Sequence, residues 1–185
     1  MNIELREPII FIVCGKARSG KSTATEYIRQ YYESKNKQCL NLMYAESIKN
    51  YAKKIIHWNG KEETKPRTFL QQLGTEIIRN QIDPHFFTKR MIDDLHIYSY
   101  FFDVLTISDA RFVDEISEPK KQFKKVIVLR IEKQDMTSEL TEGQQQHVSE
   151  NALNDFSDYD YIIQNNGTLE DLKQKIYNIL DEVKE

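Results

Sequence analysis

Residues 9–23 read Ile9-Ile10-Phe11-Ile12-Val13-Cys14-Gly15-Lys16-Ala17-Arg18-Ser19-Gly20-Lys21-Ser22-Thr23. An apolar run ends at a glycine, and Gly-Lys-Ser follows after four residues, which is the phosphate-binding loop pattern G-x-x-x-x-G-K-[ST]. Backbone N–H groups of such a loop cradle phosphates where side chains do not intrude, and Gly15 and Gly20 supply that room. The pattern predicts that Lys21 reaches the β- and γ-phosphates and that the Ser22 hydroxyl ligates Mg²⁺. The predicted phosphate-binding residues are Gly15, Lys16, Ala17, Arg18, Ser19, Gly20, Lys21, Ser22 and Thr23.

The context of this loop agrees with the pattern. A buried strand should precede it, and residues 9–13 form a continuous apolar and β-branched run of suitable length. A helix should follow it, and apolar residues recur at helical spacing from Ala24 to Tyr32. An incidental glycine-rich turn would need neither feature. We therefore predict a nucleotide-phosphate site.

Composition limits the class of protein. The 185 residues are enough for one domain with a sizeable core, and 26 Lys and Arg against 29 Asp and Glu give a net charge of −3. This balance does not favour a nucleic-acid partner, because non-specific binding to DNA depends on clustered positive charge. The sequence shows no run of about 18 apolar residues and no signal-peptide pattern, so we expect a cytoplasmic protein without a membrane partner. Cys14 and Cys39 are expected to be buried, reduced thiols.

The pattern of elements predicts an α/β fold. We expect strands at 9–13, 39–44, 102–108, 126–131 and 159–164, with helices between them, so the sheet should be parallel and covered on both faces. Thr168 and Asp171 resemble a capping box for a final helix with an apolar stripe. That stripe is Leu169, Leu172, Ile176, Ile179 and Val183.

We predict one domain, 1–185, with two additions to its core. The core comprises 8–44, 101–132 and 156–185, a helical insert spans about 45–100, and a lid spans about 133–150. The lid prediction rests on a long polar stretch without an apolar stripe.

The insert should contain several helices. We expect one at 45–58 closed by Asn59-Gly60, one that begins near Pro66, and one from 83–84 to about 100. The second should have an apolar side made of Phe69, Leu70, Leu73 and Ile77. Gly74 lies within it and predicts the close approach of a partner helix or a ligand, because glycine costs a helix about 1 kcal/mol relative to alanine.

Asp109 follows the predicted strand at 102–108, with Arg111 and Glu115 shortly after it. Ligands of open α/β sheets bind at the carboxyl ends of the strands. A carboxylate there, beside the phosphate loop, is where Mg²⁺ and its water would be held. The alternative is an aspartate that caps a helix.

Four segments in order resemble those of phage-type deoxynucleoside monophosphate kinases. They are the loop at 15–23, Leu70-Gln71-Gln72-Leu73-Gly74-Thr75-Glu76 with Arg79 and Asp83-Pro84-His85-Phe86-Phe87 after it, Ser108-Asp109-Ala110-Arg111-Phe112-Val113-Asp114-Glu115, and His147-Val148-Ser149-Glu150. The resemblance spans about residues 9–170 and leaves a phage or prophage origin open. It implies a three-layer P-loop kinase fold and transfer of the ATP γ-phosphoryl to the 5′-phosphate of a deoxynucleotide. A homodimer through the insert is also compatible with it.

The resemblance implies roles for individual residues, with ATP and Mg²⁺ as cofactors. Positioning and charge neutralisation supply most of the catalysis in phosphoryl transfer. The catalytic residues would be Lys21, Asp109, Arg111 and Arg130, with Ser22 and Asp109 at the metal. The substrate-binding residues would be Arg67, Gln71, Thr75, Arg79, Glu115, His147 and Glu150.

The sequence departs from the family in two places. Ser22 stands where the family often carries Asp, and the 134–150 segment contains no arginine or lysine to place on the transferring phosphoryl. Arg130 and Lys133, with Arg18, would have to substitute. Two alternatives therefore stay open: a kinase for another acceptor, such as a hydroxymethylpyrimidine in DNA, and a non-catalytic nucleotide sensor. A GTPase is set aside because Asp109-Ala110-Arg111-Phe112 lacks the required glycine.

Overall fold

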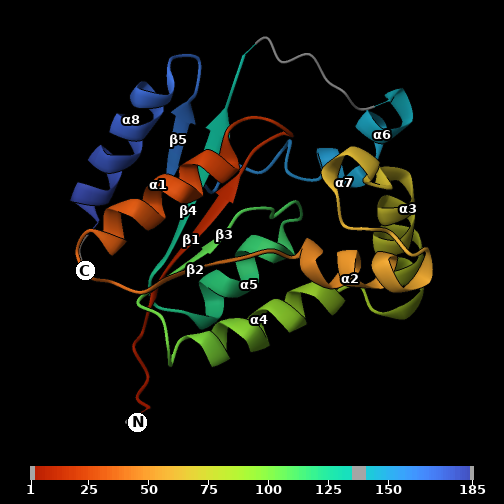
Figure 1. The fold of residues 1–185 in the computed structure, drawn as a ribbon, viewed down its shortest axis with the longest axis horizontal. Coiled ribbons are helices and arrows are strands. Elements are labelled where there is room, and N and C mark those ends of the chain that lie inside the picture. Colours follow the sequence, from red (N-terminus) through yellow and green to blue (C-terminus); the bar gives the residue numbers. More distant parts are fainter. Residues whose placement is uncertain (1–2, 135–140, 184–185) are drawn as a thin grey trace.

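The computed structural model describes residues 3–134 and 141–183, and its centre is a five-stranded parallel sheet in the order β2-β3-β1-β4-β5 (Figure 1). The α/β fold with a five-stranded parallel sheet is therefore confirmed. Three strands are shorter than predicted. The strands are β1 Ile9–Cys14, β2 Cys39–Leu42, β3 Val104–Ile107, β4 Val126–Glu132 and β5 Tyr161–Gln164.

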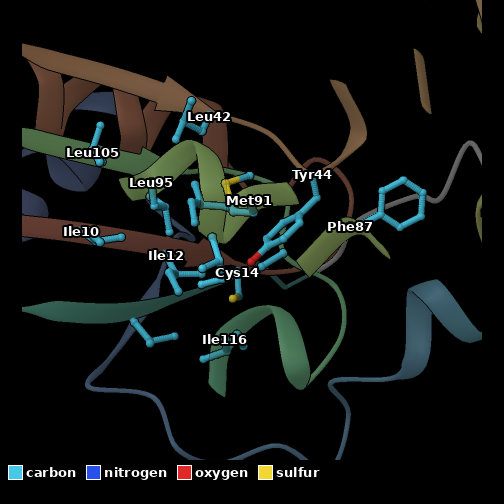
Figure 2. Packing of buried hydrophobic residues seen from close by; sticks show 14 of the residues in the cluster. Ile10, Ile12, Cys14, Leu42, Tyr44, Phe87, Met91, Leu95, Leu105 and Ile116 are labelled. Carbon is cyan, nitrogen blue, oxygen red and sulfur yellow. The ribbon is translucent and has the colours of Figure 1, made fainter. Parts of the chain in front are cut away.

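Helices cover both faces of the sheet. Helices α1 (Lys21–Glu33) and α8 (Leu169–Glu182) pack on one face, and α4 (Phe86–Tyr98) and α5 (Asp114–Gln122) on the other (Figure 1). The apolar run of β1 serves both layers because successive side chains of a strand point to opposite faces. Phe11 packs with α1 and α8, whereas Ile10 and Ile12 pack with α4 and α5 (Figure 2).

The register of the sheet places the functional segments side by side. Strand β1 is central, and Ile12 pairs with Ile107 of β3 while Cys14 pairs with Arg130 of β4. The phosphate loop therefore leaves the sheet between the segment that carries Asp109 and the strand that carries Arg130. This meeting of carboxyl ends is where open α/β sheets bind ligands.

The insert consists of α2 (Ala45–Ile55), a 3₁₀ turn (Glu62–Thr64), α3 (Arg67–Gln71) and η2 (Gln72–Ile82), followed by α4. Helices α2 and α3 lie to one side of the sheet with α6 (Glu142–Gln146) and α7 (Val148–Asn151) (Figure 1). The predicted helix at 45–58 ends early, so Asn59-Gly60 does not close it. His57 has a φ of 51°, which a right-handed helix does not admit.

Element η2 is an 11-residue π-helix, which the sequence reading missed. Its wider turn changes which side chain faces inward: Ile78 is buried, whereas Ile77, predicted to be buried, is exposed. The prediction for Gly74 is correct, because a Cβ there would lie 2.7 Å from Cδ1 of Ile48 on α2. The close neighbour is a partner helix.

The polar stretch after β4 contains two short helices although it has no apolar stripe. Thr141 and Gln144 form a capping box that starts α6, and α7 follows at once. Residues 135–140 of the predicted lid lie outside the described residues. The capping box of α8 is confirmed, but Leu169 is exposed, and Leu180 is buried in the stripe instead.

Neither cysteine forms a disulfide within the described residues, but Cys39 is only half-buried, contrary to the expectation that both are buried, because it lies on the edge strand β2. Cys14 is buried, and burial raises the pKa of its thiol to about 12. Within residues 3–134 and 141–183, the structure contains no helix that is both long and apolar enough to cross a membrane.

Candidate active site

The phosphate loop depends on its two glycines. Gly15 has a φ of 144°, and a Cβ there would lie 2.4 Å from the carbonyl oxygen of Ile131. Gly20 has a φ of 106°, and a Cβ there would lie 2.5 Å from Nδ2 of Asn165. A side chain is therefore excluded at both positions, because the positive φ disfavours it and because a neighbouring atom occupies the space it would need.

The loop opens directly into α1. Gly20 occupies the N-cap position and has no side chain, so it leaves the first-turn N–H groups of α1 available to an anion. Asn165 braces the loop from the end of β5 by donating from Nδ2 to the carbonyl oxygen of Ser19 at 2.8 Å. The sequence reading missed this brace, because Asn165 resembles an ordinary turn residue.

Lys21 is the first residue of α1, and its ammonium donates to the carbonyl oxygen of Lys16 at 2.7 Å. Burial, with the nearby charge of Arg111, lowers the pKa of Lys21 to about 8. The electrostatic stabilisation between a desolvated ammonium of this kind and a phosphate is larger than that between an exposed ammonium and a phosphate.

A cavity of about 290 Å³ joins the phosphate loop to the insert. Lys21 and Ser22 line it from α1, and its other walls include residues of α2, α3, η2, α4, α5, α7 and the segment after β3. Most of the predicted acceptor-side residues meet there. The structure brings together Arg67, Gln71, Thr75, Arg79, Asp109, Arg111, Glu115 and Glu150.

Asp109 lies at the carboxyl end of β3, as predicted, and it also caps α2. Its two carboxylate oxygens accept hydrogen bonds from the backbone N–H groups of Tyr44 and Ala45, at 2.8 and 2.9 Å. Burial raises the pKa of Asp109, and these two hydrogen bonds act in the opposite direction. Each oxygen keeps a second lone pair, so the capping role does not use all of its acceptor capacity.

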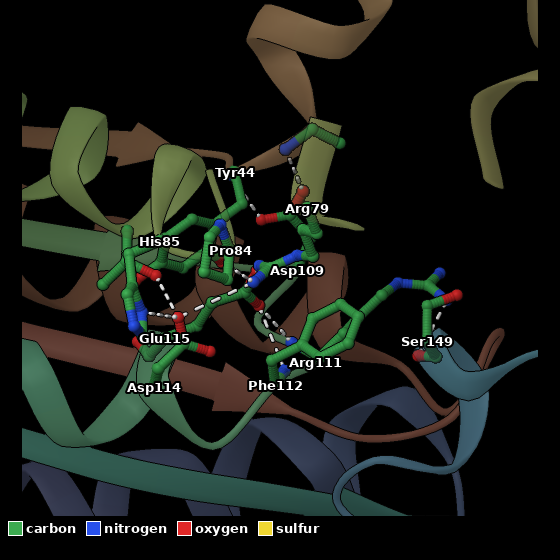
Figure 3. Close-up of polar contacts among 12 residues, drawn as sticks. Tyr44, Arg79, Pro84, His85, Asp109, Arg111, Phe112, Asp114, Glu115 and Ser149 are labelled. Atoms are coloured by element: carbon green, nitrogen blue, oxygen red, sulfur yellow. Dashed lines mark hydrogen bonds and ion pairs between the residues drawn. The ribbon is translucent and has the colours of Figure 1, made fainter. Parts of the chain in front are cut away.

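Glu115, predicted to bind substrate, is buried and joins two arginine-bearing segments (Figure 3). Oε1 accepts from Nη2 of Arg79 at 2.5 Å, and Oε2 accepts from the backbone N–H groups of Arg111 and Phe112 at 2.7 and 3.2 Å. The Arg79 guanidinium also lies 4.0 Å from the ring centre of Phe112. The Glu115 carboxylate thus fixes both the Arg79 side chain and the backbone that carries Arg111.

Arg111 reaches α7. Its guanidinium forms a short contact with the Glu150 carboxylate and donates to the Ser149 carbonyl oxygen at 3.4 Å. Behind this pair, a small cavity of about 40 Å³ is lined by Gly15, Lys16 and Arg130 among others. Arg130 donates to Tyr159 Oη and to Glu132, both at 2.7 Å, so it already has partners where it lines this cavity with residues of the phosphate loop. Its catalytic role stays a prediction.

His147 has a local structural role. Its Nδ1 accepts from the backbone N–H of Ser149 at 3.2 Å and so caps α7. Among the described residues that line the two cavities, His147 is absent. Its role toward substrate stays a prediction.

The segment predicted as a lid contacts the insert through Gln144 of α6. Gln144 donates from Nε2 to Thr68 Oγ1 at 3.1 Å, and its carbonyl oxygen accepts from Gln71 Nε2 at 3.3 Å. The segment between β4 and β5 therefore reaches across to α3, whose Gln71 lines the cavity.

Comparison with known proteins identifies the family of this chain. The model of the deoxynucleotide monophosphate kinase family matches residues 34–176. The chain belongs to this family. The match begins after residues 15–23, so the phosphate loop is a separate observation, and it supports the nucleotide-phosphate site that a deoxynucleotide monophosphate kinase needs.

Solved structures share the fold of this deoxynucleotide monophosphate kinase family member at low identity. Dephospho-CoA kinase from Campylobacter jejuni is similar at 15% identity, with 95% of this chain and 97% of that chain covered and a TM-score of 0.51. Shikimate kinase from Bacteroides thetaiotaomicron is similar at 13% identity, with 94% of this chain and 98% of that chain covered and a TM-score of 0.52. The Cys556Ala mutant of APS kinase from Mycobacterium tuberculosis is similar at 8% identity, with 94% of this chain and 97% of that chain covered and a TM-score of 0.53. These likenesses confirm the P-loop kinase fold.

The family sets the activity in general terms: a phosphotransferase that acts on a deoxynucleotide monophosphate, with ATP and typically Mg²⁺ implied. Two lysines that line the cavity, Lys49 and Lys65, were not among the predicted site residues. Nothing in the sequence separates them from their exposed neighbours, because both stand in lysine-rich polar stretches.

Proposed function

We propose that this protein transfers the γ-phosphoryl group of Mg-ATP to the 5′-phosphate of a deoxynucleoside monophosphate, giving the diphosphate and ADP. The observation that carries the proposal is that Lys21 of the phosphate loop and the arginines of the insert line one cavity. Donor and acceptor phosphates can therefore meet between them. We place the reaction in the cytoplasm, where both nucleotides are available.

The residues have distinct roles in this proposal. Phosphoryl transfer requires in-line positioning and neutralisation of the charge on the transferring group. The loop at 15–23 and Lys21 hold the donor phosphates, Arg111 lies between donor and acceptor, and Arg79 faces the acceptor side. The contact of Gln144 with α3 helps to exclude water, which would otherwise accept the phosphoryl group.

The donor set fits Mg²⁺. Ser22 and Asp109 both line the cavity, and a hydroxyl with one carboxylate is the kind of protein contribution that Mg²⁺ takes when phosphates and water supply its other ligands. When bound, Mg²⁺ would neutralise charge on the phosphates. Ser22 and Asp109 would hold it, Asp109 through the lone pairs that α2 does not use.

The direct test is ADP release from Mg-ATP with each ribo- and deoxynucleoside monophosphate, beside a DNA that contains hydroxymethyluracil. Strong stimulation by one or more deoxynucleotides supports the proposal and names the acceptor. Stimulation by the modified DNA alone would move the acceptor to a polymer. ATP binding without stimulated turnover would favour the nucleotide sensor.

We expect Asp109→Asn to lower the rate and to raise the Mg²⁺ concentration needed for half-maximal turnover, because an amide is a weaker ligand than a carboxylate. The amide also turns an N–H₂ group toward a backbone N–H of Tyr44 or Ala45, so the melting temperature should fall as well. A magnesium titration of initial rates separates the two effects. An unchanged titration with a lower melting temperature would assign Asp109 to capping alone.

A further inference from the structure

The segment between β4 and β5 brings a carboxylate to the centre of the site. Residues 134–150 contain no arginine or lysine that could neutralise the transferring phosphoryl group. The last of them is Glu150 of α7, whose side chain is only 14% exposed and lines both the large and the small cavity. Arg111 and Ser149 line both cavities as well. These three residues therefore form a wall that the two cavities share.

Arg111 lies close to the cation of the phosphate loop. Burial lowers the pKa of Lys21, and the charge of Arg111 adds to this effect, which indicates that the two cations face the same space. Both residues line the large cavity. A cation in this position can neutralise charge on a phosphoryl group that passes from donor to acceptor.

The guanidinium of Arg111 is held through one of its nitrogens. Nη1 contacts the Glu150 carboxylate and donates to the Ser149 carbonyl oxygen at 3.4 Å, so the side chain extends toward α7 (Figure 3). Among the described residues, Nε and Nη2 have no hydrogen-bond partner. These two nitrogens form one edge of the planar group, and such a pair of donors matches two oxygens of a phosphate. The contact with α7 therefore leaves a phosphate-binding edge available.

The other two carboxylates that line the cavity have different partners. Asp109 accepts from backbone N–H groups at the start of α2. Glu115 accepts from the Arg79 side chain and from the backbone N–H of Arg111. Glu115 thus fixes the backbone of Arg111, whereas Glu150 fixes its guanidinium. Because the Arg111 side chain is 41% exposed, it would sample several rotamers without the Glu150 carboxylate.

Helix α7 is itself held in place, so Glu150 has a defined position. Asn151 donates from Nδ2 to the carbonyl oxygens of Gln145 and His147, at 2.8 and 3.2 Å, which joins α7 to the end of α6. After α7, Leu153 packs against the core on the face of the sheet that α4 and α5 cover. The chain is therefore anchored on both sides of Glu150.

We propose that Glu150 is a positioning residue, whose carboxylate directs the Arg111 guanidinium at the transferring phosphoryl group. This inference rests on the proposed function, in which Arg111 lies between donor and acceptor. The segment between β4 and β5 then contributes to charge neutralisation through an arginine that follows β3, instead of through a cation of its own. In this role Glu150 does not contact the substrate, which differs from the substrate-binding role that the family resemblance implies.

Steady-state kinetics of Glu150 variants test the first consequence. ADP release would be measured with Mg-ATP and the deoxynucleotide that wild type accepts best. In Glu150→Ala, we expect kcat to fall about 10- to 100-fold, as for a displaced catalytic group, while both KM values stay within about threefold. Glu150→Gln keeps the size and an oxygen acceptor, so it should recover part of the loss. Glu142→Ala removes an exposed carboxylate from the same segment and should match wild type.

A double-mutant cycle tests whether Glu150 acts through Arg111. Arg111→Ala should lower kcat more than Glu150→Ala does, because it removes the cation itself. In the Arg111→Ala background, we expect the added Glu150→Ala to change kcat by no more than about twofold, since no guanidinium is left to position. Melting temperatures show whether each variant is folded in the assay. If Glu150→Ala is not, Glu150→Gln takes its place in the cycle.

The inference is wrong if Glu150→Ala lowers kcat equally with and without Arg111, because Glu150 would then act on the substrate directly. A higher kcat or a lower KM in Glu150→Ala would also overturn it, since the contact would then restrain Arg111. If Glu150→Ala equals an active wild type, the positioning role is rejected and the proposed function stands. Wild type without deoxynucleotide-stimulated ADP release would overturn the proposed function, and this inference with it.

Discussion

Lys21→Ala should reduce kcat by about 10²–10³-fold or more, because it removes the cation that the phosphate loop directs at the transferring group. The ammonium is held at 2.7 Å from the Lys16 carbonyl oxygen and lines the cavity beside Ser22. It is therefore in place before a nucleotide arrives, and no other residue of the loop takes that position. ADP release with a saturating acceptor, at pH 7, measures the loss.

The fold should survive this change. Burial lowers the pKa of Lys21 to about 8, so the folded protein gains little from the ammonium itself, and the melting temperature of Lys21→Ala should equal or exceed that of wild type. Lys54→Ala is the matched control and should keep full activity, because Lys54 is an exposed lysine of α2 that does not line the cavity. Near-normal turnover in Lys21→Ala would refute its assignment as the phosphate-binding cation.

Glu115→Ala should lower the free energy of unfolding by about 3–5 kcal/mol at pH 8, because it leaves Arg79 charged and poorly paired in a buried position. The Arg79 side chain is only 9% exposed, so water cannot replace the lost carboxylate. The backbone N–H groups of Arg111 and Phe112 lose their acceptor as well. Urea denaturation measures the loss, which corresponds to a fall in melting temperature on the order of 10 °C.

The pH dependence of Glu115 has a definite sign. Burial raises the pKa of Glu115 to about 7 in the folded protein, above the ordinary value of 4.5. The stabilisation that comes from proton binding at Glu115 is therefore fully present below about pH 4.5 and is lost as the pH rises through about 7. The hydrogen bonds of the carboxylate with Arg79 and with the backbone are a separate contribution, and they are what Glu115→Ala removes at pH 8. Glu115→Gln removes the titration, so its stability should change less between pH 5 and 8 than that of wild type.

Glu118→Ala is the control on the same helix. Glu118 pairs with Lys121 at the surface, so its loss should change the stability by no more than about 0.5 kcal/mol. If Glu115→Ala were as mild as Glu118→Ala, the carboxylate of Glu115 would not be what holds Arg79 and the segment after β3 in place.

Local patterns in the sequence predict the sheet and the phosphate loop well. The apolar run of β1 and the glycine spacing after it depend on neighbouring residues, and the parallel arrangement follows from the alternation of strands and helices. The same holds for the Thr168 capping box. The strand, the loop and the cap are each specified by residues close together in the chain, and the parallel arrangement follows from the order in which strands and helices alternate, so one sequence suffices to predict them.

Features that depend on distant residues could not be predicted. The π-helix η2 moves Ile78 inward where helical spacing favours Ile77, and the cap of α2 comes from Asp109, 64 residues from Ala45. Helix α6 lacks an apolar stripe and is instead started by a capping box and held by contacts with α3. The cellular location, the homodimer and the role of Lys133 stay predictions.

The attachment of the lid segment has a consequence for ionic strength. Gln144 meets Thr68 and Gln71 through an amide, a hydroxyl and a carbonyl group, none of which carries a net charge, whereas Arg111 meets Glu150 through a charge pair whose arginine side chain is 41% exposed. Salt screens the second contact and leaves the first almost unaffected. As the salt concentration rises, the contact between α7 and Arg111 therefore weakens, whereas the contact between α6 and α3 does not. The two ends of the segment thus differ in their dependence on ionic strength.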